Sequence, residues 1–589
     1  MTRNTTVLDH SLFSTVVATV LTAAAPLAAT FVDGLISGNL IGQTAFNAIN
    51  IILPISNLVM VLNLICNMGG SVLAAKALGT GDRTLARKIF SISFLSALTV
   101  SITSTALIFF NLDPLCAYLC PDPESFPLVR QYLKILALYF LLYPFTTTLN
   151  NFISVEGYPG LTTKIVVISN AVNILLDLVF IIILDWGIRG AAWATVVSGV
   201  VNVLLYIPHF LRGKSQYSLE KLSRKDLHLC KGIFSQGFGF NIFYITTNLL
   251  MMFSNALVLG NFGSDGMTMY GVCLQIQSFT FCVAVGLSIA GISQITALLV
   301  DDDFEAIRHI MKRLILNSAC FYSMIMLVMS IFPEATAALF GIHDPDILEE
   351  CRLPFFCFSF YYLCFGILAV YSTICFQMMG HVWAKAVFVL GLGFTVYVLM
   401  LALSLVSPGL MWLGFPIGGM LVLAGALFFA YSRYLKDRTL TKFTLVSRFP
   451  NDVRVNLSIR KDGQDIPQML DSLRSFSDIC EISEQNKYNV ELCCCELCDS
   501  IRESGHQPLK GYFDLTFKYR DDKFLMTVKA PGAPYCLKLS EGTLQNYHEC
   551  PESLSREETR ELILNLIPEE INYRYMFGLN VITLAWSKD

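Results

Sequence analysis

A series of apolar runs, each long enough to cross a membrane, constrains this chain more than any other feature of its sequence. A helix of about 20 apolar residues spans the ~30 Å hydrocarbon core of a bilayer, and a helix satisfies its own backbone hydrogen bonds there. Short polar turns separate the runs, which predict twelve membrane-spanning helices. Their approximate limits are 12–33, 46–67, 88–110, 128–151, 164–184, 189–211, 234–260, 268–299, 312–332, 353–377, 383–406 and 409–432.

Charge is concentrated at the end of the chain. Charged residues make up 15% of the 589-residue sequence, well below the ~25% of soluble domains. Residues 437–589 nevertheless carry 19 Lys and Arg and 24 Asp and Glu, half of the 86 charged side chains. We therefore expect an all-α polytopic membrane body, a basic linker over 437–450 and a cytosolic α+β domain over 451–589. The chain has no basic patch interleaved with aromatic residues, which argues against nucleic-acid binding.

Basic residues cluster in alternate connections between the predicted spans. They follow the second, sixth, eighth and last spans, as between Lys76 and Lys88, whereas the other connections hold almost none. Because Lys and Arg are retained on the cytoplasmic side, this pattern predicts that both termini are cytoplasmic. We expect the protein in the plasma membrane. Cys116 and Cys120 then face outward, where they form either a disulfide or two free thiols.

The sequence contains an internal repeat with an offset of 221 residues. Several identities share this offset: Gly42 with Gly263, Gly70 with Gly291, Asp82 with Asp303, Arg87 with Arg308, and Ile89 with Ile310. A duplicated six-span unit predicts two lobes, over 1–220 and 221–436, which rock around a central site to give alternating access.

Two acids interrupt the predicted spans of the first lobe. Asp177 lies near the middle of the apolar run from Ile165 to Leu184, with Asn173 one helical turn before it, and Asp33 interrupts the first run. A carboxylate at bilayer depth costs about 2.5 kcal/mol or more unless it faces a cavity or a partner. We therefore predict that these acids form a proton or cation site. The alternative is that each is a structural acid near a helix end, paired with another side chain.

The motifs around these acids resemble those of the multidrug and toxic compound extrusion (MATE) transporters. The first span reads Phe-Val-Asp-Gly-Leu-Ile-Ser-Gly-Asn-Leu-Ile-Gly over 31–42, the fifth contains Asn-Ile-Leu-Leu-Asp over 173–177, and the sixth begins Gly-Ala-Ala-Trp-Ala-Thr over 190–195. Glu-Gly-Tyr-Pro over 156–159 resembles the turn before the fifth span. The resemblance covers residues 10 to 435 and implies a V-shaped, two-lobed exporter without enzymatic activity or cofactor.

The resemblance also implies a coupling site of Asp33, Asn173, Asp177 and Thr195, of which only Thr195 comes from the resemblance alone. It implies export of organic cations, drugs or other small amphipathic compounds, driven by H⁺ or Na⁺. Two ionised acids would repel each other, and uptake of a proton or Na⁺ would relieve this repulsion and bend the first span at Pro26 or Gly34. The seventh span (234–260) and the tenth (353–377) contain no acid, which argues against coupling through the second lobe.

Candidate substrate contacts are aromatic, amide and methionine side chains in spans that would face a central cleft, although ordinary helix packing explains each of them as well. The principal candidates are Tyr139, Tyr143, Tyr244, Gln275, Gln277 and Tyr361, to which Phe243, Phe279, Tyr362, Met251, Met252 and Met269 are added. Aromatic walls with few acids suit an organic cation through cation–π contact.

The C-terminal domain alternates between strand and helix patterns. Strands are expected over 453–459, 512–519, 524–529 and 580–586, and helices over 466–479, 489–503 and 556–567. The order resembles the GHKL nucleotide-binding fold. Glu496 and Ser500 stand where that family has Glu-x-x-x-Asn, and Ala530 and Gly532 stand where it has Asp-x-Gly. Ser500 and Ala530 replace the metal-binding Asn and the adenine-reading Asp, so we expect an inactive nucleotide site.

Four cysteines fall within one expected helix, at Cys493, Cys494, Cys495 and Cys498. Their spacing allows a metal or redox site, but no second pair completes a zinc set, and buried core thiols are the preferred interpretation.

We expect a small-molecule substrate, the lipid bilayer and a cytosolic protein as partners. The rival function is a non-transporting membrane sensor that signals through the C-terminal domain.

Overall fold

The computed structural model describes residues 6–79, 82–120, 125–156, 158–211, 215, 217–300, 303–447, 453–460, 462–503, 511–520, 523–531, 556–576 and 579–587. The chain packs as two compact units. The larger comprises 19–289 and 314–432, and the other comprises 1–18, 290–313 and 433–589. The lobes predicted over 1–220 and 221–436 are a different division, which stays a prediction.

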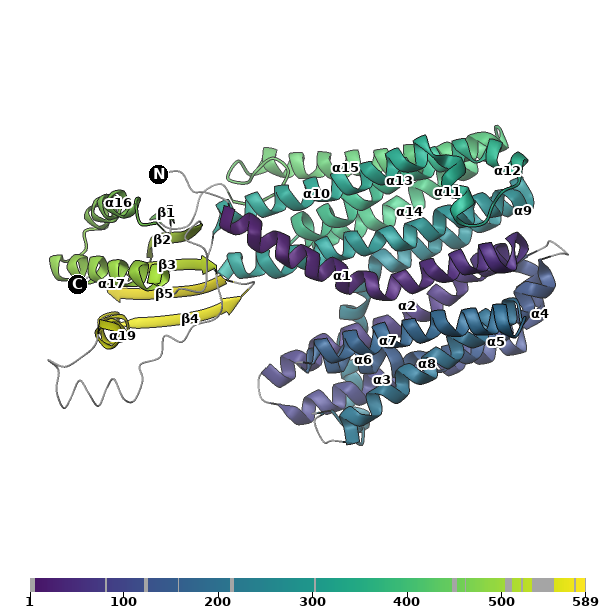
Figure 1. Ribbon diagram of the computed structural model, residues 1–589, viewed down its shortest axis with the longest axis horizontal. Helices are drawn as coiled ribbons and strands as arrows, with labels where there is room; N and C mark the ends of the chain where they lie inside the picture. Colours follow the sequence, from purple (N-terminus) through teal and green to yellow (C-terminus); the bar gives the residue numbers. More distant parts are fainter. Residues whose placement is uncertain are drawn as a thin grey trace. The chain divides into compact units, whose positions relative to one another are not determined.

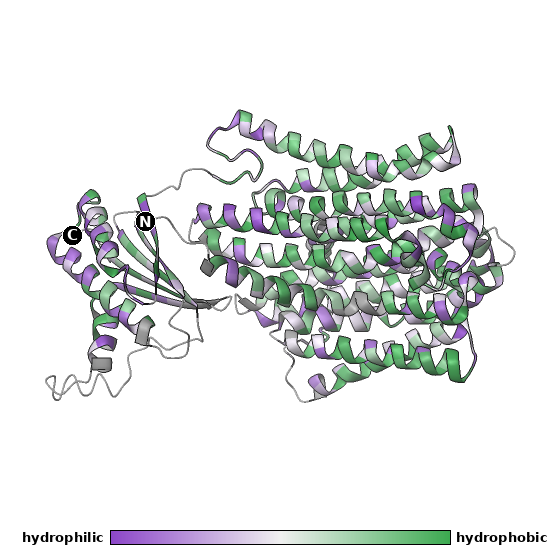
Figure 2. Ribbon diagram, turned by 45° about the horizontal axis from the view of Figure 1, so that its top comes forward, coloured by the Kyte–Doolittle hydropathy of each residue, from purple (hydrophilic) through white to green (hydrophobic). Residues whose placement is uncertain are grey.

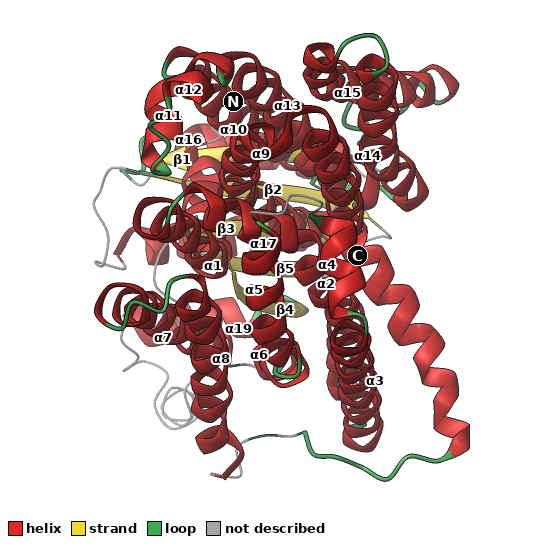
Figure 3. Ribbon diagram, turned by 90° about the vertical axis from the view of Figure 1, so that its right-hand side faces the viewer, coloured by secondary structure: helices red, strands yellow, loops and turns green. Residues whose placement is uncertain are grey.

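All regular elements in the described part of the chain before residue 437 are helical, and the strands and the one isolated bridge lie after it (Figure 3). The helices are α1 (Thr6–Ile36), α2 (Gln43–Gly79), α3 (Arg83–Phe110), α4 (Leu112–Leu119), α5 (Phe126–Phe140), α6 (Tyr143–Val155), α7 (Pro159–Leu178), α8 (Ile188–Leu211), α9 (His228–Val300), α10 (Phe304–Ile331), α11 (Pro333–Leu339), α12 (Pro345–Glu350), α13 (Arg352–Tyr371), α14 (Val382–Ser404) and α15 (Gly414–Lys436). Apolar residues dominate the long helices, whereas hydrophilic residues are frequent in the C-terminal domain (Figure 2).

The number of spans is lower than predicted when helices are counted by length and hydropathy. Among the described residues nine helices qualify, or ten if α5 and α6, bent by 45° at their junction, form one span. One reason is that α9 contains both predicted segments 234–260 and 268–299, with non-helical backbone at Gly263 (φ 60°). The count of twelve therefore stays a prediction, although each predicted segment overlaps one or two described helices.

The structure reproduces the sequence repeat in detail. Asp82 caps α3 by accepting a hydrogen bond from the backbone N–H of Leu85 (2.9 Å), and Asp303 accepts the corresponding bond from Ala306 (3.2 Å). The backbone N–H of Asp82 bonds the carbonyl of Ala77, and that of Asp303 bonds Leu298. Each partner is separated from its counterpart by the same 221 residues, so the two turns share one backbone design.

Two pairs of helices approach closely at glycines in the larger unit. A methyl group added at Gly69 would lie 1.9 Å from the carbonyl oxygen of Ile233, and one at Gly237 would lie 1.8 Å from that of Ile65, so α2 and α9 meet backbone to backbone. Farther along α9, a methyl group at Gly286 would lie 2.6 Å from the Cα of Val20 in α1. Only glycine allows such contact, as in other closely packed membrane helices.

The segments that follow the two halves are held by corresponding arginines. Arg87 pairs with Glu220 (3.5 Å), in the segment after α8, and neighbouring Lys88 pairs with Asp226 (3.0 Å). Arg308, 221 residues after Arg87, donates a hydrogen bond to the carbonyl of Ser447 (2.9 Å), in the segment after α15. Each half thus anchors its own exit segment at the same position.

The C-terminal domain is a five-stranded antiparallel sheet with helices packed on one face (Figure 1). The strand order is β1-β2-β3-β5-β4. The elements are β1 (Val453–Arg460), α16 (Ile466–Ile479), α17 (Glu484–Glu503), β2 (Tyr512–Arg520), β3 (Lys523–Pro531), α19 (Arg556–Leu566), β4 (Glu570–Met576) and β5 (Leu579–Ser587). This agrees with the expected α+β pattern, except that α17 begins five residues earlier than expected and that β4 was not among the expected strands.

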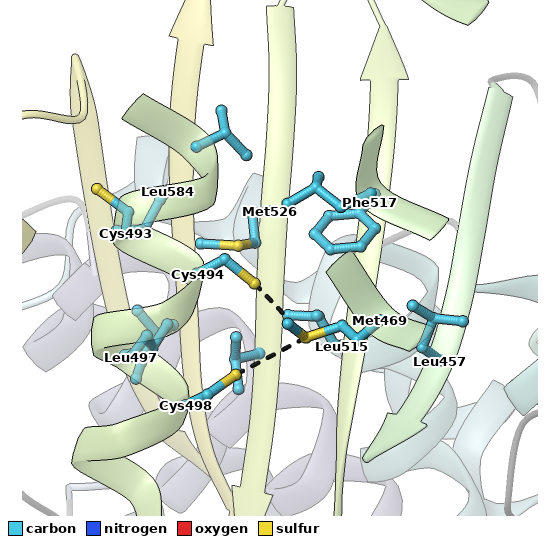
Figure 4. Close-up of a cluster of buried hydrophobic side chains, with 14 of the residues drawn as sticks. Leu457, Met469, Cys493, Cys494, Leu497, Cys498, Leu515, Phe517, Met526 and Leu584 are labelled. Carbon is cyan, nitrogen blue, oxygen red and sulfur yellow. Dashed lines mark hydrogen bonds between the residues drawn. The ribbon is translucent and has the colours of Figure 1, made fainter. Parts of the chain in front are cut away.

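Alternate residues of the strands supply the core beneath the helices, as period-two patterning requires. Leu515, Phe517, Met526 and Leu584 are fully or almost fully buried together with α17 cysteines (Figure 4). The thiols of Cys494 and Cys498 lie 3.7 and 3.9 Å from the sulfur of Met469. Cys493, Cys494 and Cys498 are therefore part of the hydrophobic core, whereas Cys495 is half-buried. Cys116 and Cys120 are both buried and form no disulfide with each other.

Candidate functional site

The two predicted acids each lie just before a break in helical regularity. Asp33 lies near the end of α1, which continues into the π-helical turn η1 (Ser37–Ile41), and Asp177 lies at the end of α7, which continues into the π-helical turn η2 (Val179–Ile183). Residues of η1 and η2 contact each other. Single π-turns inside helices are rare and frequently occur at functional sites, because they redirect the preceding side chains.

The structure brings the two acids together. A side-chain hydrogen bond joins the carboxyl groups of Asp33 and Asp177. A hydrogen bond between two carboxyl groups requires one proton between them, since two carboxylates have no donor. Asp177 is 2% exposed, and the Oδ1 of Asp33 and Oδ2 of Asp177 are buried without a hydrogen-bond partner. The two carboxyl groups thus meet inside the protein, where one proton or a cation between them would relieve their repulsion. Each acid also has one buried oxygen without a hydrogen-bond partner.

Asn173 completes the polar side of α7, and Thr195 is less clearly placed. Asn173 is 6% exposed, and its Nδ2 has no hydrogen-bond partner. The Thr195 hydroxyl donates to the carbonyl of Ala191 in its own helix (3.1 Å). Carboxylate and amide oxygens suit a hard cation such as Na⁺, while the shared proton suits H⁺. The participation of Thr195 stays a prediction.

Tyr132 was missed by the sequence analysis. This α5 side chain is 9% exposed and lies within electrostatic range of both acids, and Tyr139, seven residues later, lies near Asp33. The seven-residue spacing puts both tyrosines on one helix face. That spacing could have indicated Tyr132, since Tyr139 was already a candidate.

Three of the predicted substrate contacts, Tyr244, Gln277 and Met251, line a small cavity of about 100 Å³. Tyr244 and Gln277 face it from α9, together with Asn57 of α2 and Asn248 of α9. The Oδ1 of Asn248 and Nε2 of Gln277 are buried without hydrogen-bond partners. Unpartnered buried amides are unfavourable by about 1–3 kcal/mol each, which is the condition in which a ligand gains by bonding them.

The other substrate candidates lie elsewhere. Gln275 donates to the Oδ1 of Asn50 (3.2 Å) and contacts Gly34 of α1. Tyr139 and Tyr143 pack ring to ring, with centroids 4.9 Å apart. Tyr361 packs among Phe358, Phe365 and Phe415. These contacts fit the packing alternative, and the substrate role of these four residues stays a prediction.

Comparison with protein families agrees with this arrangement. The MatE family model matches the chain twice, over residues 18–179 and 242–403. Together the two matches cover more than half of the chain, one in each half of the repeat. The chain belongs to the MATE family. It is therefore a multi-pass membrane transporter by family, and MATE transporters act without a cofactor.

Two curated MATE relatives are multidrug export proteins MepA. The protein of Staphylococcus haemolyticus is 24% identical over 306 residues, covering 51% of this chain and 66% of the relative. That of Staphylococcus saprophyticus is 26% identical over 287 residues, covering 48% of this chain and 62% of the relative. The chain thus spans less than two thirds of the length of these two relatives.

Solved MATE structures share the fold. An inward-facing structure of a multidrug resistance MATE family transporter has a TM-score of 0.61 and covers 70% of this chain and 95% of its own. An outward-facing structure has a TM-score of 0.58 and covers 72% and 96%. Both are 19% identical to this chain.

The predicted nucleotide residues lie outside the MATE region. Glu496 on α17 is paired with Arg560 of α19 (3.3 Å), so the acid expected to face a nucleotide faces a cation instead. Ser500 lies one turn later on α17, and Ala530 on β3 is 2% exposed. Gly532 lies outside the described residues. The likeness of this domain to GHKL proteins stays a prediction.

Proposed function

We propose that this MATE protein is a secondary active exporter of organic cations, drugs or other small amphipathic compounds, driven by H⁺ or Na⁺. The observation that carries the proposal is the buried hydrogen-bonded pair of Asp33 and Asp177. Ionisable groups inside membrane helices mark ion and proton pathways, because their burial is otherwise unfavourable. The multidrug export of the MepA relatives supports the same class of substrate.

Packing of α1 supplies a route from ion binding to movement. At one end α1 carries Asp33, bonded to α7, and near its middle Thr19 donates to the carbonyl of Gly286 in α9 (2.9 Å). Loss of the shared proton leaves two carboxylates that repel, which moves the end of α1 away from α7. Because α1 is packed along α9, this movement changes the contact between the two halves of the repeat. The Pro26 side chain lies outside the described residues, and Gly34 contacts Gln275.

Everted membrane vesicles test the proposed function. We expect an imposed H⁺ or Na⁺ gradient to drive uptake of at least one member of a panel of fluorescent amphipathic compounds, and collapse of the gradient with an ionophore to abolish it. Vesicles with Asp177→Asn serve as the control, with protein abundance matched by immunoblot. Gradient-independent uptake, or no uptake of any panel member, would contradict the proposal.

We propose further that the C-terminal domain regulates transport. Lys529 of β3 pairs with Asp303 (3.6 Å), the residue that caps α10, and both side chains are buried. Asn456 of β1 donates to Glu305 in the first turn of α10 (3.4 Å). These bonds support contact between the domain and the turn before α10. Removal of 450–589 should leave the helical body folded but change its flux.

The same contact favours the sensor alternative, since a domain bonded to the α9–α10 turn could read its position. In either case we propose that the domain does not hydrolyse ATP. Glu496 forms an ion pair with Arg560, and Ser500 stands where GHKL proteins have the metal-binding Asn. Titration of Mg-ATP into the purified full-length protein should give no saturable heat, whereas micromolar binding would contradict this proposal. We also propose that both termini are cytoplasmic, that the protein resides in the plasma membrane and that the domain binds a cytosolic protein.

A further inference from the structure

A second and larger cavity has a lining that the proposed coupling site does not explain. It has a volume of about 800 Å³ and is bounded by α2, α3, α9, the π-helical turn η4 (Ser372–Gln377) and the start of α14. Of the described residues that line it, Lys385 alone is charged. Asp and Glu are absent from this described lining, so its fixed charge is positive.

Lys385 is buried rather than extended to the membrane surface. A lysine near the end of a membrane helix usually reaches its ammonium group into water. Lys385 is three residues into α14, yet it is 7% exposed, and its Nζ donates to the Oε1 of Gln377 at 2.6 Å. The side chain is thus held inside the protein, where an ammonium group is costly without a partner.

The neutral amide of Gln377 accepts only one of the hydrogen bonds that the Lys385 ammonium group can donate. An ammonium has three N–H donors, and Gln377 accepts one of them. Within the described part of the chain no carboxylate is paired with Lys385, so its positive charge is not neutralised. An anionic head group would supply both the acceptors and the charge that the site lacks.

The remaining walls are largely apolar. Phe234, Phe238 and Trp383 line the cavity and are exposed by 42%, 48% and 85%. In a bilayer these exposed rings face lipid, so the apolar tail of a ligand can lie along them while its head group lies at Lys385. The combination of one buried cation and an aromatic wall defines an amphipathic ligand.

We propose that this cavity is a substrate site that takes amphipathic anions, with the head group on Lys385 and Gln377 and the tail against Trp383, Phe234 and Phe238. The inference narrows the substrate class of the proposed exporter and rests on that function for the claim that the anion is cargo. Binding itself does not depend on export. Carboxylate, sulfonate and phosphate head groups share the required chemistry, whether they come from a free compound or an anionic lipid.

Saturable quenching of Trp383 fluorescence measures occupancy directly. The full-length protein in phosphatidylcholine nanodiscs is titrated with bromododecanesulfonate, and separately with bromododecyltrimethylammonium, which has the same tail and the opposite charge. We expect saturable quenching by the sulfonate only, and its loss in Trp383→Phe. Equal saturable quenching by the cation would overturn the proposal.

Charge substitutions assign the binding to the head-group contact. Lys385→Gln should weaken sulfonate binding by roughly tenfold or more, as expected for loss of a charge-assisted contact. Lys385→Arg should retain the preference for the anion. Lys164→Gln is the matched control, because Lys164 precedes Lys385 by the repeat offset and is exposed. Gln377→Glu, which places a carboxylate on the ammonium, should abolish the anion preference even if Lys385→Gln fails to fold.

Lipid composition and flux separate the remaining outcomes. If phosphatidylglycerol in the nanodisc displaces the sulfonate at bilayer concentrations and vesicles do not transport the sulfonate, the cavity is a lipid site and the substrate claim is overturned. Sulfonate binding that needs Lys385, with failure of all gradient-driven transport, would contradict the proposed export function and leave the anion site intact. Gradient-driven transport of cations alone would overturn the claim that the anion is a substrate and leave export intact.

Discussion

The two halves of the repeat share their turns but not their membrane charges. In the first half Asp33 and Asp177 form a hydrogen-bonded pair, whereas the residues 221 positions later are Ser254 and Val398. In the second half Lys385 lies buried beside a cavity, whereas the residue 221 positions earlier, Lys164, is exposed. The caps at Asp82 and Asp303 are nevertheless the same.

This contrast indicates what duplication fixes and what it leaves to change. Backbone hydrogen bonds at helix starts are required in both halves, because an unsatisfied backbone group in a membrane protein is unfavourable by several kcal/mol. Side chains at bilayer depth, in contrast, are determined by the ion or substrate that each half binds. We infer that the first half binds the coupling ion and the second half carries the charge that selects substrate.

The largest expected effect breaks the acid pair in the first half. Asp33→Asn and Asp177→Asn should each abolish gradient-driven efflux, because an amide cannot exchange a proton and carries no charge to hold Na⁺. The shape of the side chain is retained, so the protein should reach the membrane in normal amounts. Flux in vesicles and abundance by immunoblot are measured together, and normal flux in both variants would exclude the proposed site.

The next largest effect separates the two halves at the α2–α9 contact. Gly237→Ala places a methyl group 1.8 Å from the carbonyl oxygen of Ile65, so the helices must move apart. We expect destabilisation of about 1–3 kcal/mol or more, seen as a lower midpoint of thermal unfolding in detergent. Gly391→Ala in α14 is the control, since a methyl group there would meet nothing within 4 Å. Equal midpoints for the two variants would contradict the close approach.

A smaller effect distinguishes the two equivalent caps. Asn caps helices as well as Asp does, so Asp82→Asn should change stability by less than about 0.5 kcal/mol. Asp303→Asn keeps the cap of α10 but removes the charge that pairs with buried Lys529, and should destabilise by about 2 kcal/mol. Hydrogen–deuterium exchange should rise in β3 and the first turn of α10 in Asp303→Asn only. The same exchange in both variants would contradict the proposed contact between Lys529 and Asp303.

The smallest effect concerns the segment after the first half. The backbone N–H of Ser223 and the ammonium of Lys88 bond Asp226 and lower its pKa to about 2. Since the pKa is below its unfolded value of about 3.9, the bonds stabilise the segment at higher pH and are lost as pH falls through about 2. Exchange of residues 223–227 should rise in this acid range, and Asp226→Asn should show the rise at neutral pH. Protection that is insensitive to both changes would show that other contacts hold the segment.

Much of this fold could be predicted from the sequence because membrane and strand patterns are strong local signals. Ile466–Ile479 was predicted to the residue, since polar turns bound the helix on both sides. The polar stretch over 261–266 divides two predicted spans, whereas in the structure α9 continues through it with non-helical backbone at Gly263 only. Asp33 and Asp177 were found since acids are rare in apolar runs; that they share a hydrogen bond depends on long-range packing of α1 on α7, which no local pattern encodes.

Lys385 is a buried charge in a membrane helix that the sequence does not single out. Its position just inside a predicted span was visible, but a lysine near a span end usually reaches water, so the sequence alone favoured a surface role. Only the structure shows that its ammonium group turns to Gln377 and that a cavity lies beside it. Tyr361 is the opposite case: the sequence suggested a substrate contact, and the structure shows packing against other rings. An aromatic residue in a span looks the same in the sequence whether it packs or binds substrate.

One measurement tests the division of roles most directly: the affinity of bromododecanesulfonate at different pH and Na⁺ concentrations, without any gradient. Linkage requires that the coupling ion and the substrate change each other's affinity by the same factor, typically about 5- to 150-fold. We predict that acidification or added Na⁺ weakens sulfonate binding to the wild-type protein. In the double variant Asp33→Asn and Asp177→Asn, binding should persist and no longer depend on pH or Na⁺. An undiminished dependence in the double variant would contradict the account.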